Sequence, residues 1–250
     1  MNEPGSLIRS LAGRPVARNF HSYVINEIGS AIVAGRFPVG SSLPNDAEMS
    51  SKFDVSRTVL REAIKTLEAK GLVEARPKVG TKVSPKSRWN YFDHTILAWQ
   101  FAAGIDETLL QQMTSLRLAM EPQAAAAIAN SRTADDLRLM NYWIKQMERS
   151  LTSPLNFAIA DFEFHVAIAD VHRNPFLRSL LGVMELVHCS VYQPYVSQDQ
   201  MVDKVLLADH AALLRCIEKS DSTGAQKACK KLIELEYQFG QQSVKQSSGR

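Results

Sequence analysis

The sequence contains no continuous run of the roughly 18 apolar residues that a membrane-spanning helix requires, so no membrane span is predicted. Low-complexity tracts and internal repeats are absent, which excludes repeat architectures. Residues 1–14 lack the apolar core of a secretory signal, and a cytoplasmic protein is expected. Cysteine is scarce, and the spacing of its three occurrences matches neither a metal knuckle nor a redox pair: Cys189, Cys216 and Cys229.

Charge is divided unevenly along the chain. Residues 1–88 contain 14 Lys and Arg against 8 Asp and Glu, a net charge of +6. Residues 89–250 contain 15 against 18, a net charge of −3. A basic N-terminal third followed by an acidic remainder indicates that the first part meets a polyanion such as DNA and the second part does not.

The basic part has the element order of a winged helix-turn-helix. Helical spacing of apolar residues predicts three helices, and two short β-prone runs follow them: residues 20–37, 46–53 and 57–70, then 72–75 and 81–83. Asn45 and Ser56 are expected to cap the second and third helices, and Gly71 to end the third. We therefore predict a DNA-binding domain over residues 19–84.

The third helix has two chemically different faces. Its apolar residues share the face that packs on the other helices: Leu60, Ala63, Ile64 and Leu67. Arg57 and Arg61 lie one turn apart on the other face, and an arginine can bond guanine through two hydrogen bonds. The predicted DNA contacts are Ser56, Arg57, Thr58, Arg61 and Lys65 in this helix, and Lys78, Gly80 and Lys82 in the wing. The alternative is a solvated face with ion pairs, such as Lys65 with Glu62 or Glu68.

The rest of the chain is predicted to be an all-α helical bundle, which makes the fold class mainly α. Helices are expected near residues 93–103, 106–130, 133–150, 154–171, 175–195, 200–219 and 223–242. The predicted division of the chain is a flexible N-terminus at 1–18, the DNA-binding domain at 19–84, a linker at 85–92, a helical domain at 93–242 and a flexible tail at 243–250.

Residues 35–83 resemble the winged helix of the GntR superfamily of bacterial regulators. The similarity lies in the G-x-x-P-x-G turn, the LP before the second helix, VSRT-x-x-REA-x-x-x-L in the third helix, KGLV, and the wing glycine. The resemblance implies that Ser56, Arg57, Thr58 and Arg61 contact operator DNA, as do wing residues. The second helix departs from the family at Ala47, where arginine is frequent.

The helical part resembles the FCD domain of the FadR branch of that superfamily, which senses small molecules and dimerises. The matching segments are 116–129, 161–177 and 208–221, and residues 88–100 are similar to the linker region of galactonate-operon repressors. The resemblance implies a homodimer that binds operator DNA and an effector-binding site at Arg117, Asp161, His165 and His210.

Many FCD domains hold a divalent metal with one Asp and three His. Asp161, His165 and His210 match three of these ligands, and an imidazole–carboxylate set suits zinc, nickel or manganese. The resemblance places the third histidine in the last helix, where this chain has Leu232, so the predicted metal set is incomplete. Water or a substrate carboxylate could complete it, or the same groups could serve only as hydrogen-bond partners.

The sequence allows two interpretations of the role of Arg117. In the family such an arginine reaches into the pocket, where its guanidinium suits a carboxylate. The alternative is an ion pair with Glu121, four residues later on the same helix.

The sequence therefore predicts a transcription regulator without enzymatic activity, a repressor of a carboxylate or sugar-acid catabolic operon that a small organic acid releases from DNA. Two other functions are weighed against it. One is a metal-dependent helical hydrolase with an accessory DNA-binding domain, although the sequence carries neither G-x-S-x-G nor H-E-x-x-H. The other is a non-specific architectural DNA binder, which an acidic helical domain does not favour.

Overall fold

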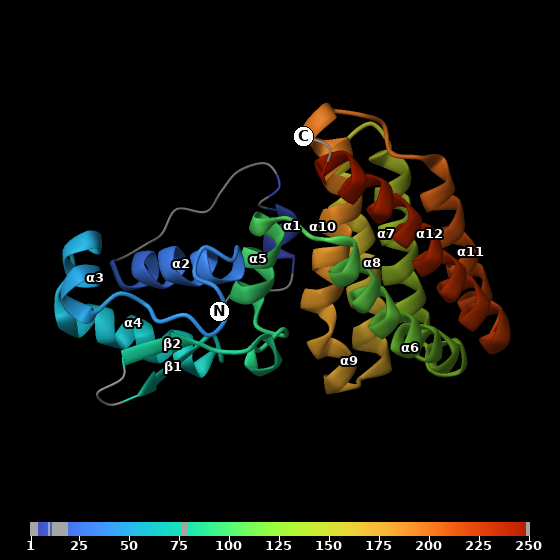
Figure 1. Cartoon of the computed structure of the whole chain (residues 1–250). Helices are drawn as coiled ribbons and strands as arrows, with labels where there is room; N and C mark the ends of the chain where they lie inside the picture. Colours follow the sequence, from blue (N-terminus) through green and yellow to red (C-terminus); the bar gives the residue numbers. More distant parts are fainter. Residues whose placement is uncertain (1–4, 10, 12–19, 77–79, 249–250) are drawn as a thin grey trace. The chain divides into compact units, whose positions relative to one another are not determined.

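A computed structural model describes residues 5–9, 11, 20–76 and 80–248 (Figure 1). The chain divides into two compact units, one of residues 15–103 and one that joins residues 1–14 to residues 104–250. Helices dominate both units, which confirms the predicted mainly α fold. Among the described residues, no helix is long and apolar enough to cross a membrane.

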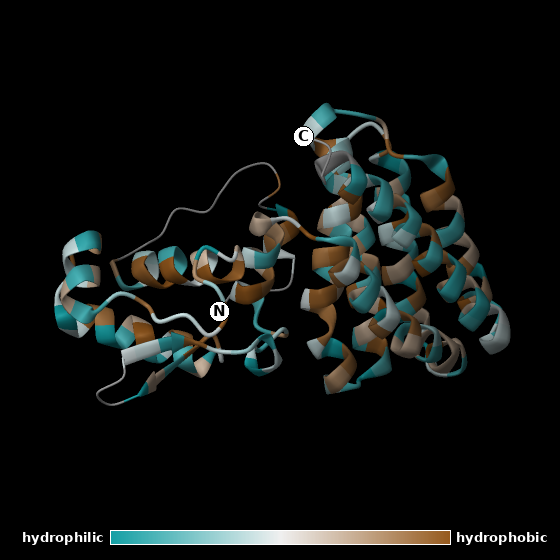
Figure 2. Cartoon of the chain, viewed as in Figure 1, coloured by the Kyte–Doolittle hydropathy of each residue, from teal (hydrophilic) through white to brown (hydrophobic). Residues whose placement is uncertain are grey.

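The first unit has the predicted order of three helices and a hairpin. It contains α2 (Phe20–Val33), α3 (Asp46–Phe53), α4 (Arg57–Ala69), β1 (Val73–Arg76), β2 (Gly80–Val83), the 3-10 turn η2 (Lys86–Arg88) and α5 (His94–Ala103). The two strands are antiparallel, with Val73 opposite Val83 and Arg76 opposite Gly80. Figure 2 shows hydrophobic residues along α2, whose buried side chains join those of α4 in one core.

Local chemistry fixes the turn between α3 and α4. Asn45 forms the predicted capping box with Glu48 at the start of α3. Asp54 ends α3 in the left-handed region (φ 52°), and the Ser56 hydroxyl accepts a hydrogen bond from the Val59 amide at the start of α4. These short-range contacts set the direction in which α4 leaves the turn.

Helix α5 belongs to the first unit, so the predicted boundary at residues 85–92 is wrong. The Trp99 ring packs so closely on α2 that a Cβ added to Gly29 would lie 2.2 Å from it. The Trp99 Nε1 group donates a hydrogen bond to Asn26 at 3.3 Å. Trp89, inside the predicted linker, is 5% exposed and belongs to the core of this unit. The chain therefore leaves the first unit after Ala103.

The second unit is a helical bundle. Its main helices are α6 (Glu107–Ser131), α7 (Ala134–Arg149), α8 (Pro154–His172), α9 (Pro175–Ser179), α10 (Leu181–Gln198), α11 (Lys204–Glu218) and α12 (Ser222–Ser248). Every residue from Leu181 to Tyr192 is buried, so this part of α10 is enclosed on all sides. The predicted helix 175–195 is two helices, and α12 continues through most of the predicted tail at 243–250.

A short N-terminal helix, α1 (Ser6–Arg9), packs on α8 and α10. Ile8 is fully buried, and the amides of Leu7 and Ile8 donate hydrogen bonds to the Glu185 carboxylate at 2.6 and 3.1 Å. The predicted flexible N-terminus at 1–18 is therefore wrong for this helix. Sequence periodicity could not reveal it, because four residues are too short to show a helical repeat.

Candidate functional site

Helix α4 presents the predicted cationic face to solvent. Its buried residues are the four expected ones: Leu60, Ala63, Ile64 and Leu67. Arg57, Thr58, Arg61 and Lys65 are exposed. Ser56 is exposed as well, but its hydroxyl already caps α4. The structure thus brings the predicted helix contacts together on one accessible surface.

Two of these cations form ion pairs. Arg61 Nε lies 3.3 Å from Asp46 of α3, and Lys65 Nζ lies 2.9 Å from Glu62. The second pair is the one named in the alternative reading. Both cation side chains are about 70% exposed, 68% for Arg61 and 70% for Lys65, so solvent screens these pairs strongly. Such weak pairs can give way to a phosphate or a base.

The wing is the β1–β2 hairpin. Gly80 adopts a φ of +94°, and a Cβ built there would meet nothing within 4 Å, so open space surrounds its backbone. Lys82 lies half-buried on β2, opposite Glu74. Lys78, the third predicted wing contact, lies outside the described residues.

The second unit gathers titratable side chains from several helices in its interior. Asp161 and His165 come from α8, His188 from α10 and His210 from α11, and we call these four residues the histidine cluster. Glu236 of α12 lies beside them. Each of the five is at most 1% exposed. The bundle thus carries a polar centre inside an apolar core.

The imidazoles converge on two carboxylate oxygens. The Nε2 atoms of His165, His188 and His210 lie 3.5, 3.2 and 2.7 Å from Asp161 Oδ1. The same three atoms lie 3.8, 3.7 and 3.9 Å from Glu236 Oε1. The other oxygen of Asp161 accepts a hydrogen bond from the Tyr192 hydroxyl at 2.5 Å.

Contacts behind the cluster orient the rings. The Nδ1 atoms of His188 and His210 lie 2.7 Å from the carbonyls of Met184 and Leu206, one turn earlier on their own helices. In His165 the Nδ1 atom faces Glu121 at 3.5 Å. An acceptor behind Nδ1 holds the proton there and leaves the inner Nε2 lone pair free to bind a cation.

Arg117 is enclosed by carboxylates and is 1% exposed. It contacts Glu121 at 2.5 and 3.2 Å and Glu236 at 2.6 Å. The ion pair with Glu121 that was one of the two readings is present, and Glu236 adds a second. Burial works against the charge of Arg117, but the two carboxylates outweigh burial and raise its pKa.

Charges within the cluster shift its protonation equilibria. Burial alone would lower the pKa of His188, but Asp161 and Glu236 outweigh burial and raise it to about 9. The pKa of His210 is also raised, because Asp161 and Glu236 again outweigh the effect of burial. Burial would raise the pKa of Asp161, and the adjacent His210 and His188 hold it well below its ordinary value. Without a metal, His188 and His210 therefore favour their protonated forms beside an ionised Asp161.

The donor set fits a divalent transition metal. His165 Nε2 and Glu236 Oε1 are buried and have no hydrogen-bond partner, although both can bind a cation. Single donor atoms from Asp161, His165, His188 and Glu236 lie within 4.8 Å of one another. Imidazole nitrogens with carboxylate oxygens suit zinc, nickel or manganese.

Asp161, His165 and His210 are predicted from the sequence, whereas His188 and Glu236 are not. Leu232, which stands where the family has its third histidine, is a fully buried apolar residue. A third imidazole comes instead from His188 of α10, whose Nε2 atom lies 3.2 Å from Asp161 Oδ1. Helix α12 does reach the cluster, through Glu236 one turn after Leu232. The available signals were His188, the one histidine of α10, and Glu236, which lies between Leu235 and Tyr237 in α12.

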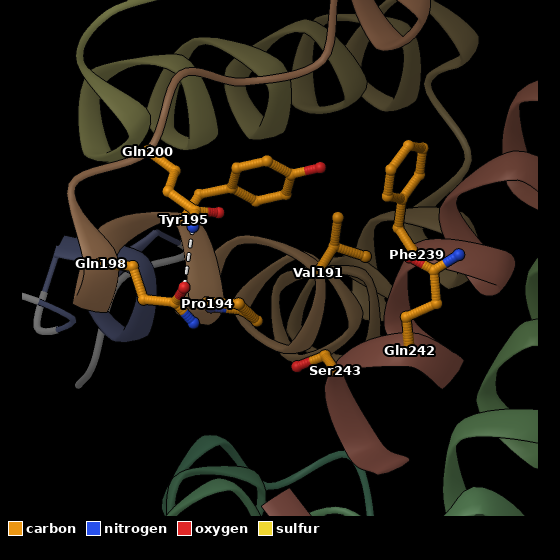
Figure 3. Close-up of a pocket in the computed structure, with 8 residues that line it drawn as sticks. All are labelled: Val191, Pro194, Tyr195, Gln198, Gln200, Phe239, Gln242 and Ser243. Carbon is orange, nitrogen blue, oxygen red and sulfur yellow. Dashed lines mark hydrogen bonds between the residues drawn. The ribbon is translucent and has the colours of Figure 1, made fainter. Parts of the chain in front are cut away.

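A pocket of about 200 Å³ lies near the cluster, between the ends of α10 and α12 (Figure 3). Its lining is Val191, Pro194, Tyr195, Gln198, Gln200, Phe239, Gln242 and Ser243. The Tyr195 ring contacts Tyr192 at 6.3 Å between centroids, and Tyr192 bonds Asp161. One layer of aromatic side chains thus links the pocket to the histidine cluster.

Both units match known protein families. Residues 21–83 match the family of bacterial regulatory proteins called gntR, and residues 112–235 match the FCD domain. The chain is 33% identical to the HTH-type transcriptional regulator YieP of Escherichia coli K12, over 85% of this chain and 92% of the relative. It is 29% identical to the galactonate operon transcriptional repressor of the same organism, over 84% and 92%.

A solved structure described as "Lar controls the expression of the Listeria monocytogenes agr system and mediates virulence" shares the fold. Its TM-score is 0.59 at 18% identity, over 91% of this chain and 99% of that one. The chain therefore belongs to the gntR family of bacterial transcription regulators, with an FCD domain behind its DNA-binding domain.

Proposed function

We propose that this regulator is a homodimeric repressor that binds operator DNA through α4 and the wing, and that a small organic acid bound near the histidine cluster releases it. The observation that carries the proposal is the pairing of an exposed cationic face on α4 with a buried cluster of metal-binding groups in the other unit. Relatives named for galactonate and uxu operons support a sugar acid as the effector.

In the DNA-bound state, Arg57 and Arg61 would enter the major groove with α4. Ser56 and Thr58, at the positive end of the helix dipole, would meet phosphate, as would Lys65. Lys78, Gly80 and Lys82 of the wing would contact the backbone or the minor groove. Two copies related by a two-fold axis would read a palindrome.

In the effector domain, Asp161, His165, His188 and His210 would hold a zinc, nickel or manganese ion. The ion supplies a Lewis acid that binds a carboxylate oxygen. The amide and hydroxyl groups of the adjacent pocket offer neutral hydrogen-bond partners for the hydroxyls of a sugar acid. An acid can release DNA only if it binds the non-repressing arrangement more tightly than the repressing one.

The proposed DNA-binding role of α4 is tested with fluorescent promoter fragments. They are taken from the genes next to the gene that encodes this regulator. Arg57→Ala and Arg61→Ala should each abolish the preference for a specific fragment over competitor DNA at a stated salt concentration. Arg138→Ala, an exposed cation in the helical unit, is the matched control and should bind as the parent does. Equal binding by all three variants would contradict the assignment of α4.

The effector part is tested on the specific complex. Galactonate, other sugar acids and dicarboxylates are titrated into the complex with and without a chelator. We expect one class of acid to release the DNA, and the chelator to weaken that release. A non-specific architectural protein would show neither fragment preference nor acid release.

A further inference from the structure

The Glu236 carboxylate lies where an external carboxylate would have to bind. Oε2 accepts a hydrogen bond from Arg117 Nη1 at 2.6 Å. Oε1 faces the three imidazole Nε2 atoms of the histidine cluster at 3.7 to 3.9 Å and has no hydrogen-bond partner. One oxygen thus meets the guanidinium and the other meets the metal-binding groups, which is how a bound acid would be held.

The net charge of the buried groups decides whether the site can accept an anion. The buried charged groups that contact the imidazoles, or that contact those groups, are the carboxylates of Glu121, Asp161 and Glu236 and the guanidinium of Arg117. With neutral imidazoles they leave two negative charges, which one divalent cation neutralises. An additional anion would then be a buried charge without a partner, which is costly. Without the charge of Glu236, the same site would carry one positive charge and would favour an anion.

We propose that Glu236 is an internal carboxylate ligand of the cation held by the histidine cluster, and that an acid effector binds by displacing it. The inference rests on the proposed function for the effector, but not on the DNA-binding role of α4. Displacement would break the contact between Glu236 on α12 and Arg117 on α6. Acid binding would therefore remove one buried ion pair between α12 and α6, and a regulator can use such a change to shift helix packing.

Zinc affinity and acetate test the internal ligand directly. Glu236→Ala removes a carboxymethyl group whose heavy atoms are those of acetate, so acetate can fill the space and restore both contacts. Zinc affinity is measured on the full chain by competition with a chromophoric chelator, in chloride buffer with and without acetate. We expect Glu236→Ala to weaken zinc binding by about tenfold or more. Millimolar acetate should restore most of this loss.

Two further variants control for other causes. Glu236→Gln keeps the volume and loses the charge, so its zinc affinity should also fall, and acetate should not restore it because no space is available. Glu234→Ala, on the same helix but with its side chain 51% exposed, should match the parent with and without acetate. Circular dichroism establishes that each variant is folded.

Several results would overturn the inference. They are a zinc affinity of Glu236→Ala within about twofold of the parent, a loss that acetate does not restore, or an equal gain from acetate in the parent. Absence of zinc binding by the parent would overturn it as well. If the alanine variant does not fold, an unchanged zinc affinity in Glu236→Gln decides against it. None of these results depends on DNA, so failure of the operator experiment remains distinguishable.

Discussion

Arg117 on α6 and Glu236 on α12 form an ion pair of 2.6 Å in the interior of the helical unit, and each side chain is 1% exposed. Glu121 holds the same guanidinium from the other side at 2.5 Å. Water cannot solvate either partner there, so each charge depends on the other. This pair therefore joins the packing of two long helices to the electrostatics of the histidine cluster.

Removal of Arg117 should destabilise the protein strongly. Arg117→Ala leaves Glu121 and Glu236 as buried carboxylates without their cationic partner, and loss of one member of a buried pair costs about 3–5 kcal/mol. The measurement is urea unfolding of the metal-free protein followed by circular dichroism. The exposed Arg138→Ala should change the free energy of unfolding by less than about 0.5 kcal/mol. Equal stability of the two variants would show that Arg117 is not buried with its partners.

Stability of the metal-free protein should fall as the pH rises from about 6.5 to about 9. The pKa of His188 is raised in the fold to about 9, so its proton stabilises the folded state fully below the unfolded pKa and is lost through about pH 9. The expected loss is on the order of 3 kcal/mol. Melting curves in a chelator measure it.

Two comparisons test the source of this pH effect. Added zinc should flatten the dependence, because metal-bound imidazoles are neutral. His188→Gln should reduce the slope in the chelator, since the group that loses the proton is gone. A metal-free protein whose stability is constant over this range would contradict a protonated His188 in the fold.

The DNA-binding unit could be predicted from the sequence because its signals are local. Asn45 with Glu48 and Ser56 with Val59 are contacts within a few residues, and they fix the start of α3 and of α4. The boundary after this unit could not be predicted in the same way. It depends on the fit of Trp99 against Gly29, two residues 70 positions apart whose contact has no signature in helical periodicity.

In the histidine cluster, too, the contacts between residues far apart in the sequence could not be predicted. Asp161 and His165 could be paired from their spacing on one helix, because residues i and i+4 share a face. His188 and Glu236 enter from α10 and α12, and only the packing of the bundle brings them to Asp161. The resemblance pointed to position 232, where a leucine leaves the predicted set incomplete, and the residue of α12 that reaches the cluster is Glu236, one helical turn later.

The ion pair between Arg61 and Asp46 should compete with DNA. Asp46→Asn frees the guanidinium and removes a negative charge from the predicted DNA-binding face, while an exposed pair contributes only about 0–1 kcal/mol to folding. DNA affinity should therefore rise a few fold with little change in melting temperature. Fluorescence anisotropy on the specific fragment measures the affinity. A weaker complex would indicate that Asp46 holds Arg61 in the binding geometry.

Helix α1 should protect its own amides from hydrogen exchange. The Leu7 and Ile8 amides bond the buried Glu185, and Ile8 is fully buried. Ile8→Asp places a charge in that apolar site, so α1 should detach and exchange at these amides should accelerate, while the bundle stays folded. Arg9→Ala breaks only a half-exposed ion pair with Glu163 and should leave the exchange almost unchanged.

The packing of α5 on α2 can be tested at Gly29. A methyl group there would lie 2.2 Å from the Trp99 ring, far inside van der Waals contact, so Gly29→Ala should destabilise the DNA-binding unit by about 1–3 kcal/mol. Gly224→Ala is not a suitable control because its Cβ would meet Asp221. Trp99→Leu in the Gly29→Ala background makes room for the methyl group and should cost less than the sum of the two single changes. If the two substitutions lower the free energy of urea unfolding by strictly additive amounts, α5 does not pack on α2 at this position. The domain boundary would then lie in the predicted linker at 85–92.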